Sequence, residues 1–342
     1  MRVSPMRKIP GWVQGFSCLV AIIDCVLTRV HPASAMTTMM HAEMRMRIAT
    51  VSMTKAVLAR AAYSPPMADT TPAEARERPD FDSLAGDYAR FRTSYSEELF
   101  DTIVHYAGIA RGGRVLDLGC GTGLGMAAYL RRGFEVVGVD VASVMMEQAK
   151  ASLPAGSLAS FVEGRAEQLP LPDASFDLVS CAQAFHWFEP RATFAECARV
   201  LRPGGAIAIF WKHAARTDPF TQACEGIIRE WLGDDAAVRS RDHADEHEAG
   251  WPVFWEFAAA PGEPAGSRPF VDACKRVVEF ELERSASEFV GYQRSRERIR
   301  KVLGPKRAAF LEELDKRLAA IAPRDARVTQ RQIQYVFLAR RA

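Results

Sequence analysis

Short apolar runs alternate with amphipathic segments from residue 112 onward. Runs with the length and composition of buried strands lie at 114–118, 135–140, 176–182 and 206–211, with a shorter run at 161–163. Segments of helical period separate them, at 126–132, 142–153 and 190–200. Buried strands separated by helices indicate βαβ units, whose crossovers are right-handed, so the pattern predicts a doubly wound parallel sheet.

The alternation stops after residue 211 and returns about 60 residues later. Residues 212–269 predict a largely helical insertion. Beyond it we expect a strand at 277–282, helices at 287–302 and 306–321, and a strand at 328–338. The whole pattern predicts an α/β fold with seven strands, a core at 112–211, the insertion at 212–269 and C-terminal strands and helices at 270–342.

The N-terminal residues differ in composition from the rest of the chain. Residues 1–66 contain eight basic and two acidic residues, whereas the remaining chain contains 36 basic and 40 acidic ones. We interpret 1–66 as a poorly structured leader or targeting extension, followed by one domain at 67–342. Residues 1–35 resemble a signal or organelle-targeting sequence, with a basic start and an apolar stretch at 16–26. Asp24 interrupts that stretch, so we expect no stable membrane insertion and a cytoplasmic protein, with organelle targeting or export as the alternatives.

Composition excludes several classes of function. A net charge of +2 gives no electrostatic basis for a nucleic-acid partner. The seven cysteines are odd in number and contain no CxxC pair, which argues against a disulfide framework and a zinc site. His243, Glu246 and His247 resemble a metal cluster in spacing, but a polar run of this kind usually faces solvent. We therefore predict no metal.

A glycine-rich turn follows the first strand. Asp117 precedes Gly119, Gly121 and Gly123, and glycines at alternate positions allow a ligand to lie against bare N–H groups. The dinucleotide fingerprint GxGxxG fails in both registers, because Leu124 or Met126 stands where the third glycine is required, and no GK[ST] follows. An acid before three alternating glycines suits a ligand with an amino-acid end.

A second acid, Asp140, ends the next strand. Its carboxylate would lie at the carboxyl edge of the sheet, where it can accept both hydroxyls of a ribose. The two acids and the glycine turn together predict a nucleoside-containing ligand that carries an amino-acid end.

Five motifs resemble, in order and spacing, those of class I S-adenosylmethionine-dependent methyltransferases of the methyltransferase type 11 kind. They are Asp117-x-Gly119-x-Gly121-x-Gly123, Asp140, Ala166-Glu167, 176–179 and 201–205. Residues 182–188 (AQAFHWF) and the lead-in 81–95 are similar to the trans-aconitate methyltransferase-like group. That group usually shows Arg-Pro-x-Tyr-Pro where this chain has Arg92-Thr-Ser-Tyr95-Ser96, so both prolines are missing.

The resemblance implies a Rossmann-like methyltransferase sheet that binds S-adenosyl-L-methionine. The backbone of Gly119, Gly121 and Gly123, with Asp117, should meet the methionine portion. Asp140 should bind the ribose, and Val141 should cover one face of the adenine. The remaining residues that the resemblance assigns to the cofactor are Ala166 and Glu167, at the adenine amino edge, and Gln183.

Two groups of residues are candidates for the acceptor side. His186 and Trp187 follow the strand at 176–182, where His186 can act as a base or a hydrogen-bond donor and Trp187 as an apolar or cation–π wall. Tyr88, Arg92 and Tyr95 have helical spacing, so we expect them on one face of a helical lid formed by 81–106. Arg92 can bind a carboxylate of either the cofactor or the substrate.

The predicted function is methyl transfer to an O, N or C atom of a small organic molecule, with a carboxylic acid as a candidate. Since the cofactor's methyl group is already activated, alignment of the nucleophile can supply most of the catalysis. Two alternatives remain open at this point. They are a non-catalytic S-adenosylmethionine-binding protein and an NAD-dependent oxidoreductase.

Overall fold

The computed structural model describes residues 84–215, 217–233, 247 and 250–342. The predicted leader at 1–66 lies outside the described residues. Within the described part of the chain, no helix is both long and apolar enough to cross a membrane.

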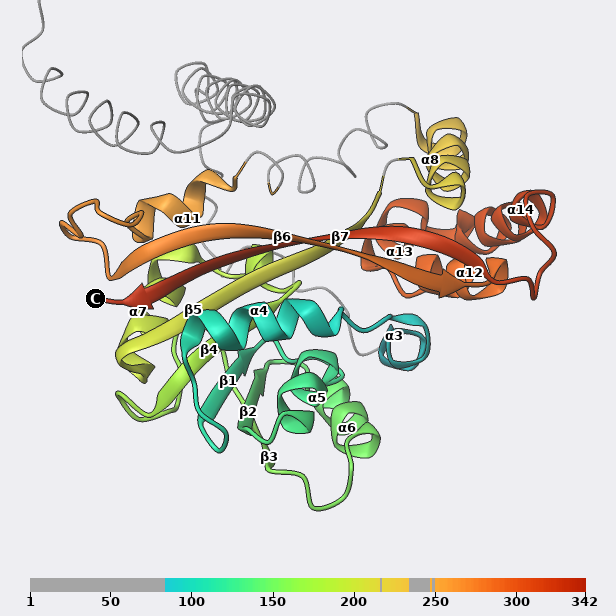
Figure 1. Ribbon diagram of the computed structural model, residues 1–342. Helices are drawn as coiled ribbons and strands as arrows, with labels where there is room; N and C mark the ends of the chain where they lie inside the picture. Colours follow the sequence, from blue (N-terminus) through green and yellow to red (C-terminus); the bar gives the residue numbers. More distant parts are fainter. Residues whose placement is uncertain (1–83, 216, 234–246, 248–249) are drawn as a thin grey trace, which may run out of the picture. The chain divides into compact units, whose positions relative to one another are not determined.

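A single seven-stranded sheet organises the domain, in the order β3-β2-β1-β4-β5-β7-β6 (Figure 1). Its strands are β1 Arg114–Leu118, β2 Glu135–Asp140, β3 Ala159–Glu163, β4 Phe176–Ala182, β5 Leu201–Ala214, β6 Phe270–Arg284 and β7 Val328–Arg341. Strands β1 to β5 pair in parallel, whereas β7 is antiparallel to both β5 and β6. The carboxyl ends of β1, β2, β4, β5 and β6 therefore meet at one edge of the sheet. The α/β fold and the seven strands predicted from the sequence are confirmed.

The helices flank this sheet on both faces (Figure 1). They are α3 Ala85–Phe91, α4 Glu97–Ala107, α5 Leu124–Arg131, α6 Ser143–Ser152, α7 Pro190–Val200, α8 Pro219–Leu232, α11 Pro252–Phe257, α12 Ala286–Arg294, α13 Glu297–Leu303 and α14 Arg307–Ala319. A short 3₁₀ turn, Phe185–Trp187, follows β4. Helix α7 occupies the range that the sequence predicts, since Pro190 starts it and the Glu189 side chain caps its N–H groups.

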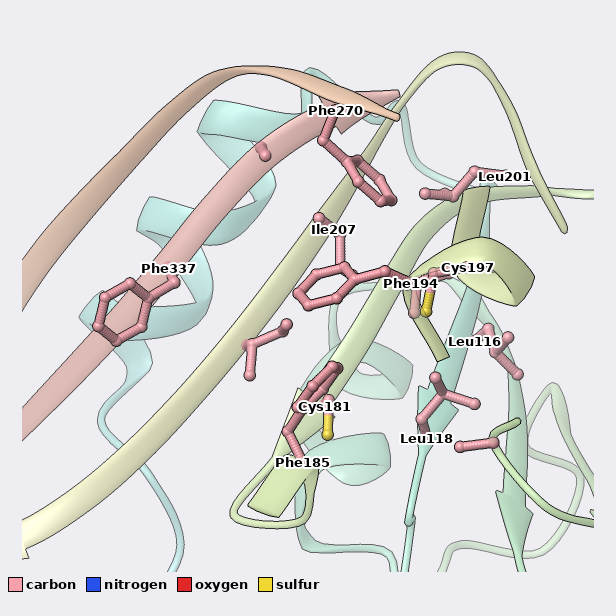
Figure 2. Packing of buried hydrophobic residues seen from close by; sticks show 14 of the residues in the cluster. Leu116, Leu118, Cys181, Phe185, Phe194, Cys197, Leu201, Ile207, Phe270 and Phe337 are labelled. Carbon is pink, nitrogen blue, oxygen red and sulfur yellow. The ribbon is translucent and has the colours of Figure 1, made fainter. Parts of the chain in front are cut away.

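Each face of the sheet buries its own apolar core. Figure 2 shows the core on the α7 side, where Phe194 and Cys197 pack over β-strand residues such as Leu116 and Ile207. On the other face, Leu99, Phe100 and Ile103 of α4 are buried against the sheet. A third cluster joins α8, α12, α13 and α14. Two covered faces explain why the central strands are continuously apolar.

The predicted lid at 81–106 is wrong in its second half. Helix α4 is a structural helix of the sheet layer, because three of its apolar side chains have exposed fractions of 0–1%. The expectation that Tyr88, Arg92 and Tyr95 share one helical face is also wrong. Helix α3 ends at Phe91, Arg92 has extended backbone (φ −75°, ψ 130°), and Ser96 caps the start of α4. Tyr95 therefore lies in a linker between two helices.

The C-terminal elements differ from their predicted bounds. Strand β6 begins at Phe270, seven residues before the predicted start at Val277, and its register shifts between Val271 and Cys274. The predicted helix 287–302 is divided into α12 and α13 at Ser295 and Arg296. In the predicted insertion, β5 extends to Ala214, and the described remainder contains α8 and α11.

Candidate functional site

The glycine turn lies between β1 and α5 at the carboxyl edge of the sheet. Gly119, Gly121 and Gly123 all have left-handed backbone, with φ of 65°, 51° and 80°. The N–H groups of Gly119 and Cys120 both donate to Val139 O of β2, at 2.8 and 3.1 Å. This left-handed conformation favours glycine, because a Cβ would crowd the following carbonyl.

Gly119 is also required by close packing, because the turn touches the segment after β4. A Cβ built on Gly119 would lie 2.5 Å from Ala184 Cβ and 3.2 Å from Phe188 Cζ. Gly156 provides a matched control, since it has φ of 76° but nothing within 4 Å of its added Cβ.

Gly119→Ala is expected to lower the free energy of unfolding by roughly 2–5 kcal/mol, combining the left-handed cost and overpacking. Gly156→Ala should lower it by only about 1–2 kcal/mol, the left-handed cost alone. Urea denaturation of both variants measures the difference. Equal losses in the two variants would show that the approach of the turn to Ala184 does not restrict position 119.

Asp140 links the end of β2 to this turn. Its Oδ2 accepts the N–H of Gly121 at 2.8 Å, and its Oδ1 accepts the N–H of Ala142 at 2.9 Å. Each carboxylate oxygen has two acceptor positions, so a carboxylate can bind a backbone N–H and a hydroxyl together. Val141 follows with an exposed fraction of 38%, as a residue covering a ligand's flat face requires. The turn and Asp140 are therefore in direct contact at the carboxyl edge of the sheet, the edge where the sequence predicts Asp140.

Asp117 lies buried beneath the turn, with an exposed fraction of 1%. Burial is the main cause that raises the pKa of its carboxyl group to about 7, and the charge of Asp140 adds to it. Among the described residues, Asp117 Oδ1 and the hydroxyl of neighbouring Thr122 are buried without a hydrogen-bond partner. Buried polar atoms are usually paired, so two unpaired ones at the same turn point to a ligand or water there.

These features fit the proposed cofactor. The unpaired Asp117 Oδ1 can accept from an ammonium group, and the backbone at Gly121 is open, since the nearest atom to an added Cβ is Met145 Cε at 3.7 Å. Asp140, beside Gly121, is a carboxylate of the kind that suits ribose hydroxyls. The sequence did not single out Thr122, because nothing in its spacing marks it.

Glu167 has a structural role that the sequence did not anticipate. Its Oε1 accepts the N–H of Glu189 at 3.0 Å, and its Oε2 lies 3.5 Å from Arg165 Nε. Ala166 is buried in the core on the α7 side. Oε1 of Glu167 thus holds the start of α7 and Oε2 pairs with Arg165, and the contact of Glu167 with adenine stays a prediction.

The segment after β4 carries backbone strain. Gln183 has φ of 59°, which is unusual for a residue with a Cβ, and its Nε2 donates to Lys212 O at 3.0 Å. Strained residues often cluster at functional sites. Gln183 therefore joins the end of β4 to the end of β5 rather than being fixed by the glycine turn.

His186 and Trp187 form the 3₁₀ turn beyond Gln183. Their rings lie 4.7 Å apart, and Trp187 has an exposed fraction of 44%. Trp211 Nε1 of β5 donates to His186 Nδ1 at 3.4 Å. Because an indole N–H can only donate, Nδ1 of His186 is the acceptor in this contact.

Arg92 lies among aromatic rings rather than on an exposed lid. Its guanidinium stacks over Tyr88 at 4.5 Å and over Tyr292 of α12 at 5.0 Å. Tyr95 packs against Phe210 at 5.0 Å, and burial is the main cause that raises its pKa. The sequence did not single out Tyr292, because no motif surrounds it.

His247 corrects the expectation of a solvent-facing polar run. It has an exposed fraction of 1%, stacks on Trp211 at 3.8 Å, and its Nδ1 lies 3.1 Å from His213 Nε2. His243 and Glu246 lie outside the described residues.

Comparison with known proteins supports a methyltransferase domain. Residues 116–209 match the family described as methyltransferase domain. An uncharacterised methyltransferase of Mycobacterium bovis is 44% identical over 131 residues, which cover 38% of this chain and 51% of the relative. The ubiquinone biosynthesis O-methyltransferase of Idiomarina loihiensis is 39% identical over 146 residues, covering 41% of this chain and 51% of that protein. The chain thus spans about half the length of these curated relatives.

The fold is shared with a solved structure. A proposed type II methyltransferase from Anaeromyxobacter dehalogenans superposes with a TM-score of 0.50 and 24% identity, covering 73% of this chain and 97% of that one. These matches support a class I methyltransferase with the Rossmann-like fold for the core of the domain. They cover the glycine turn, Asp140 and β4, where the sequence motifs lie.

Proposed function

We propose that this chain, whose residues 116–209 match a methyltransferase domain, transfers a methyl group from S-adenosyl-L-methionine to a small organic acceptor. The observation that carries the proposal is the hydrogen bond of 2.8 Å from Gly121 N to Asp140 Oδ2. It joins an open backbone turn to a carboxylate of the kind that binds ribose, at the carboxyl edge of adjacent strands.

The chain's residues divide the binding between them. Asp117 accepts from the ammonium of the methionine tail, and the absence of a side chain at Gly121 lets that tail approach the backbone closely. Asp140 accepts from the ribose hydroxyls, and Val141 covers the adenine. The cofactor supplies a methyl group that is already activated by its sulfonium. The protein's task is therefore to align the acceptor and exclude water.

The acceptor is best described as a carboxylic acid. His186 Nδ1 accepts from Trp211, so this ring nitrogen is not available to remove a proton, which favours a carboxylate over a hydroxyl nucleophile. A carboxylate nucleophile needs no base. The similarity of 182–188 to the trans-aconitate methyltransferase-like group supports the same class of acceptor, with Trp187 as a wall beside it.

Calorimetry and a turnover assay test this function with the full chain. We expect S-adenosylhomocysteine to bind and NAD not to bind. S-adenosylhomocysteine should be released from S-adenosylmethionine in the presence of some members of a panel of small carboxylic acids. Cofactor binding without turnover on any acceptor would favour a non-catalytic binding protein. Binding of NAD in its place would favour the oxidoreductase.

A further inference from the structure

Three cationic side chains from distant parts of the sequence lie together at the carboxyl edge of the sheet. Arg92 lies in the linker between α3 and α4, Lys212 lies on β5, and Arg284 is the last residue of β6. Thr93 Oγ1 accepts from Lys212 Nζ at 2.6 Å and from Arg284 Nη2 at 3.5 Å. Arg92 and Arg284 both stack on Tyr292, at 5.0 and 4.8 Å. We call Arg92, Lys212 and Arg284 the cation cluster.

The cation cluster has no acidic partner within the part of the chain that the structure describes. No carboxylate there lies within ion-pair distance of any of its three members. Arg284 has an exposed fraction of only 4%, and its long contact with Thr93 is the only hydrogen bond of its side chain among the described residues. Buried charges are normally paired, and Glu288 and Asp218 act on Arg284 only from beyond ion-pair distance, so its guanidinium is open to a closer anion from outside.

The electrostatics of the neighbouring groups show the same excess of positive charge. Burial, followed by the charges of Arg284 and Arg92, holds the pKa of Lys212 well below its ordinary value. The positive charges also act on the phenol of Tyr292. Burial alone would raise the pKa of Tyr292, but the charges of Arg92, Arg296 and Arg284 outweigh burial, so the pKa is lowered. A negative ligand would relieve this mutual repulsion.

Gln334 provides an independent sign of an unfilled polar site. It lies directly opposite Lys212 in the β5–β7 pairing, and paired residues face the same side of a sheet. Its Oε1 accepts from Ser96 Oγ at 2.6 Å, but its Nε2 is buried without a partner among the described residues. An amide donor and three cations therefore lie near the same linker, residues 92–96.

We propose that the cation cluster binds an anionic group of the methyl acceptor, a carboxylate or a phosphate, at a point away from the methylated atom. This inference rests on the proposed function. The guanidinium forks of Arg92 and Arg284 suit bidentate contact with such a group. Lys212 already donates to Thr93 O, Thr93 Oγ1 and Ser94 O, so it holds the linker in place and adds its charge.

The position of the cluster favours the acceptor over the methionine carboxylate of the cofactor. In the strand order β2-β1-β4-β5-β7-β6, the glycine turn and Asp140 belong to β1 and β2, whereas Lys212 and Arg284 belong to β5 and β6. The cluster thus lies on the other side of β4. Gln183 connects the two sides through its hydrogen bond to Lys212 O.

Anion binding by the full chain, saturated with S-adenosylhomocysteine, tests the proposal. Succinate and inorganic phosphate serve as probes, with neutral succinamide for comparison, and affinity is measured by calorimetry. We expect at least one of the two anions to bind and succinamide not to bind. Arg284→Met should weaken that binding by roughly 10- to 100-fold, because it removes charge-assisted hydrogen bonds. Arg284→Lys should recover part of the affinity, since it keeps the charge but not the fork.

Control variants separate the possible outcomes. Arg276→Met changes an exposed arginine on the same strand and should leave anion affinity unchanged. Lys212→Met tests the cluster independently if Arg284→Met fails to fold. Equal anion affinity in the wild type, Arg284→Met and Lys212→Met, or no binding of either probe, would overturn the proposal. So would a loss of S-adenosylhomocysteine affinity in Arg284→Met with anion binding intact, because the cluster would then bind the cofactor. Failure of the proposed function is distinct, since the wild type itself would not bind S-adenosylhomocysteine.

Discussion

Asp140→Ala is expected to weaken S-adenosylhomocysteine binding by about 100-fold or more, because two hydrogen bonds from ribose hydroxyls to a charged acceptor are lost. The same change removes the acceptor for Gly121 N and Ala142 N, so the turn also loses its support. Calorimetric titration of the purified variant gives the affinity. A thermal unfolding curve shows whether the fold remains.

Asp177 provides the control for this prediction. It also accepts a backbone N–H from a neighbouring strand, Arg114 N at 2.8 Å, and its other oxygen pairs with Arg202. It lies, however, at the amino end of β4, on the opposite edge of the sheet. Asp177→Ala should reduce stability while leaving cofactor affinity within about twofold, a change below 1 kcal/mol. Unchanged affinity in Asp140→Ala would refute the ribose assignment.

Asp117→Asn is expected to stabilise the free protein above pH 7 and to weaken cofactor binding. The native pKa of about 7 lies above the ordinary value of 3.8, so the native state favours the protonated carboxyl. The cost of ionising this buried group is absent below about pH 4, grows between pH 4 and 7, and is complete above pH 7. Asparagine removes it, with an upper limit of about 4 kcal/mol for a shift of this size.

Unfolding curves of wild type and Asp117→Asn between pH 5 and 9 measure this effect. The stability gain of the variant should increase with pH and level off above about pH 7. Its affinity for S-adenosylhomocysteine at pH 8 should fall by roughly tenfold or more, since the ammonium loses a charged acceptor. A variant that is less stable than the wild type at pH 8, or a gain that does not depend on pH, would contradict the role of Asp117.

The parts of the fold that could be predicted from the sequence depend on local signals. Helix α7 begins at a proline and ends before a Pro-Gly-Gly run, and β1 and β2 are continuous apolar runs. The start of β6 has no continuous apolar or alternating pattern. The strand is irregular there, since Asp272 has φ of 52° and the register against β7 shifts between Val271 and Cys274. No proline or glycine marks the break between α12 and α13. The break depends on a contact from a distant segment, since Ser295 Oγ accepts from Arg92 Nε at 3.1 Å.

The candidate site divides in the same way. The glycine turn and Asp140 could be predicted, since each is a short motif with a fixed place on a strand. Lys212, Arg284 and Gln334 could not, because they stand on three different strands and meet only when the sheet forms. Glu167 has a motif but also a structural contact that the motif does not reveal, since its Oε1 accepts Glu189 N, and its contact with adenine stays a prediction.

Strand β5 alternates between two environments from one residue to the next. Phe210 and Lys212 face α4 and the linker, whereas Trp211 faces the aromatic core with Phe337 and Trp251. A shift of one residue against β7 would exchange the two sets. The ammonium of Lys212 would then lie in the apolar core, and the indole of Trp211 would take its place beside the linker. A single-residue insertion or deletion between Phe210 and Lys212 is therefore expected to destabilise this fold.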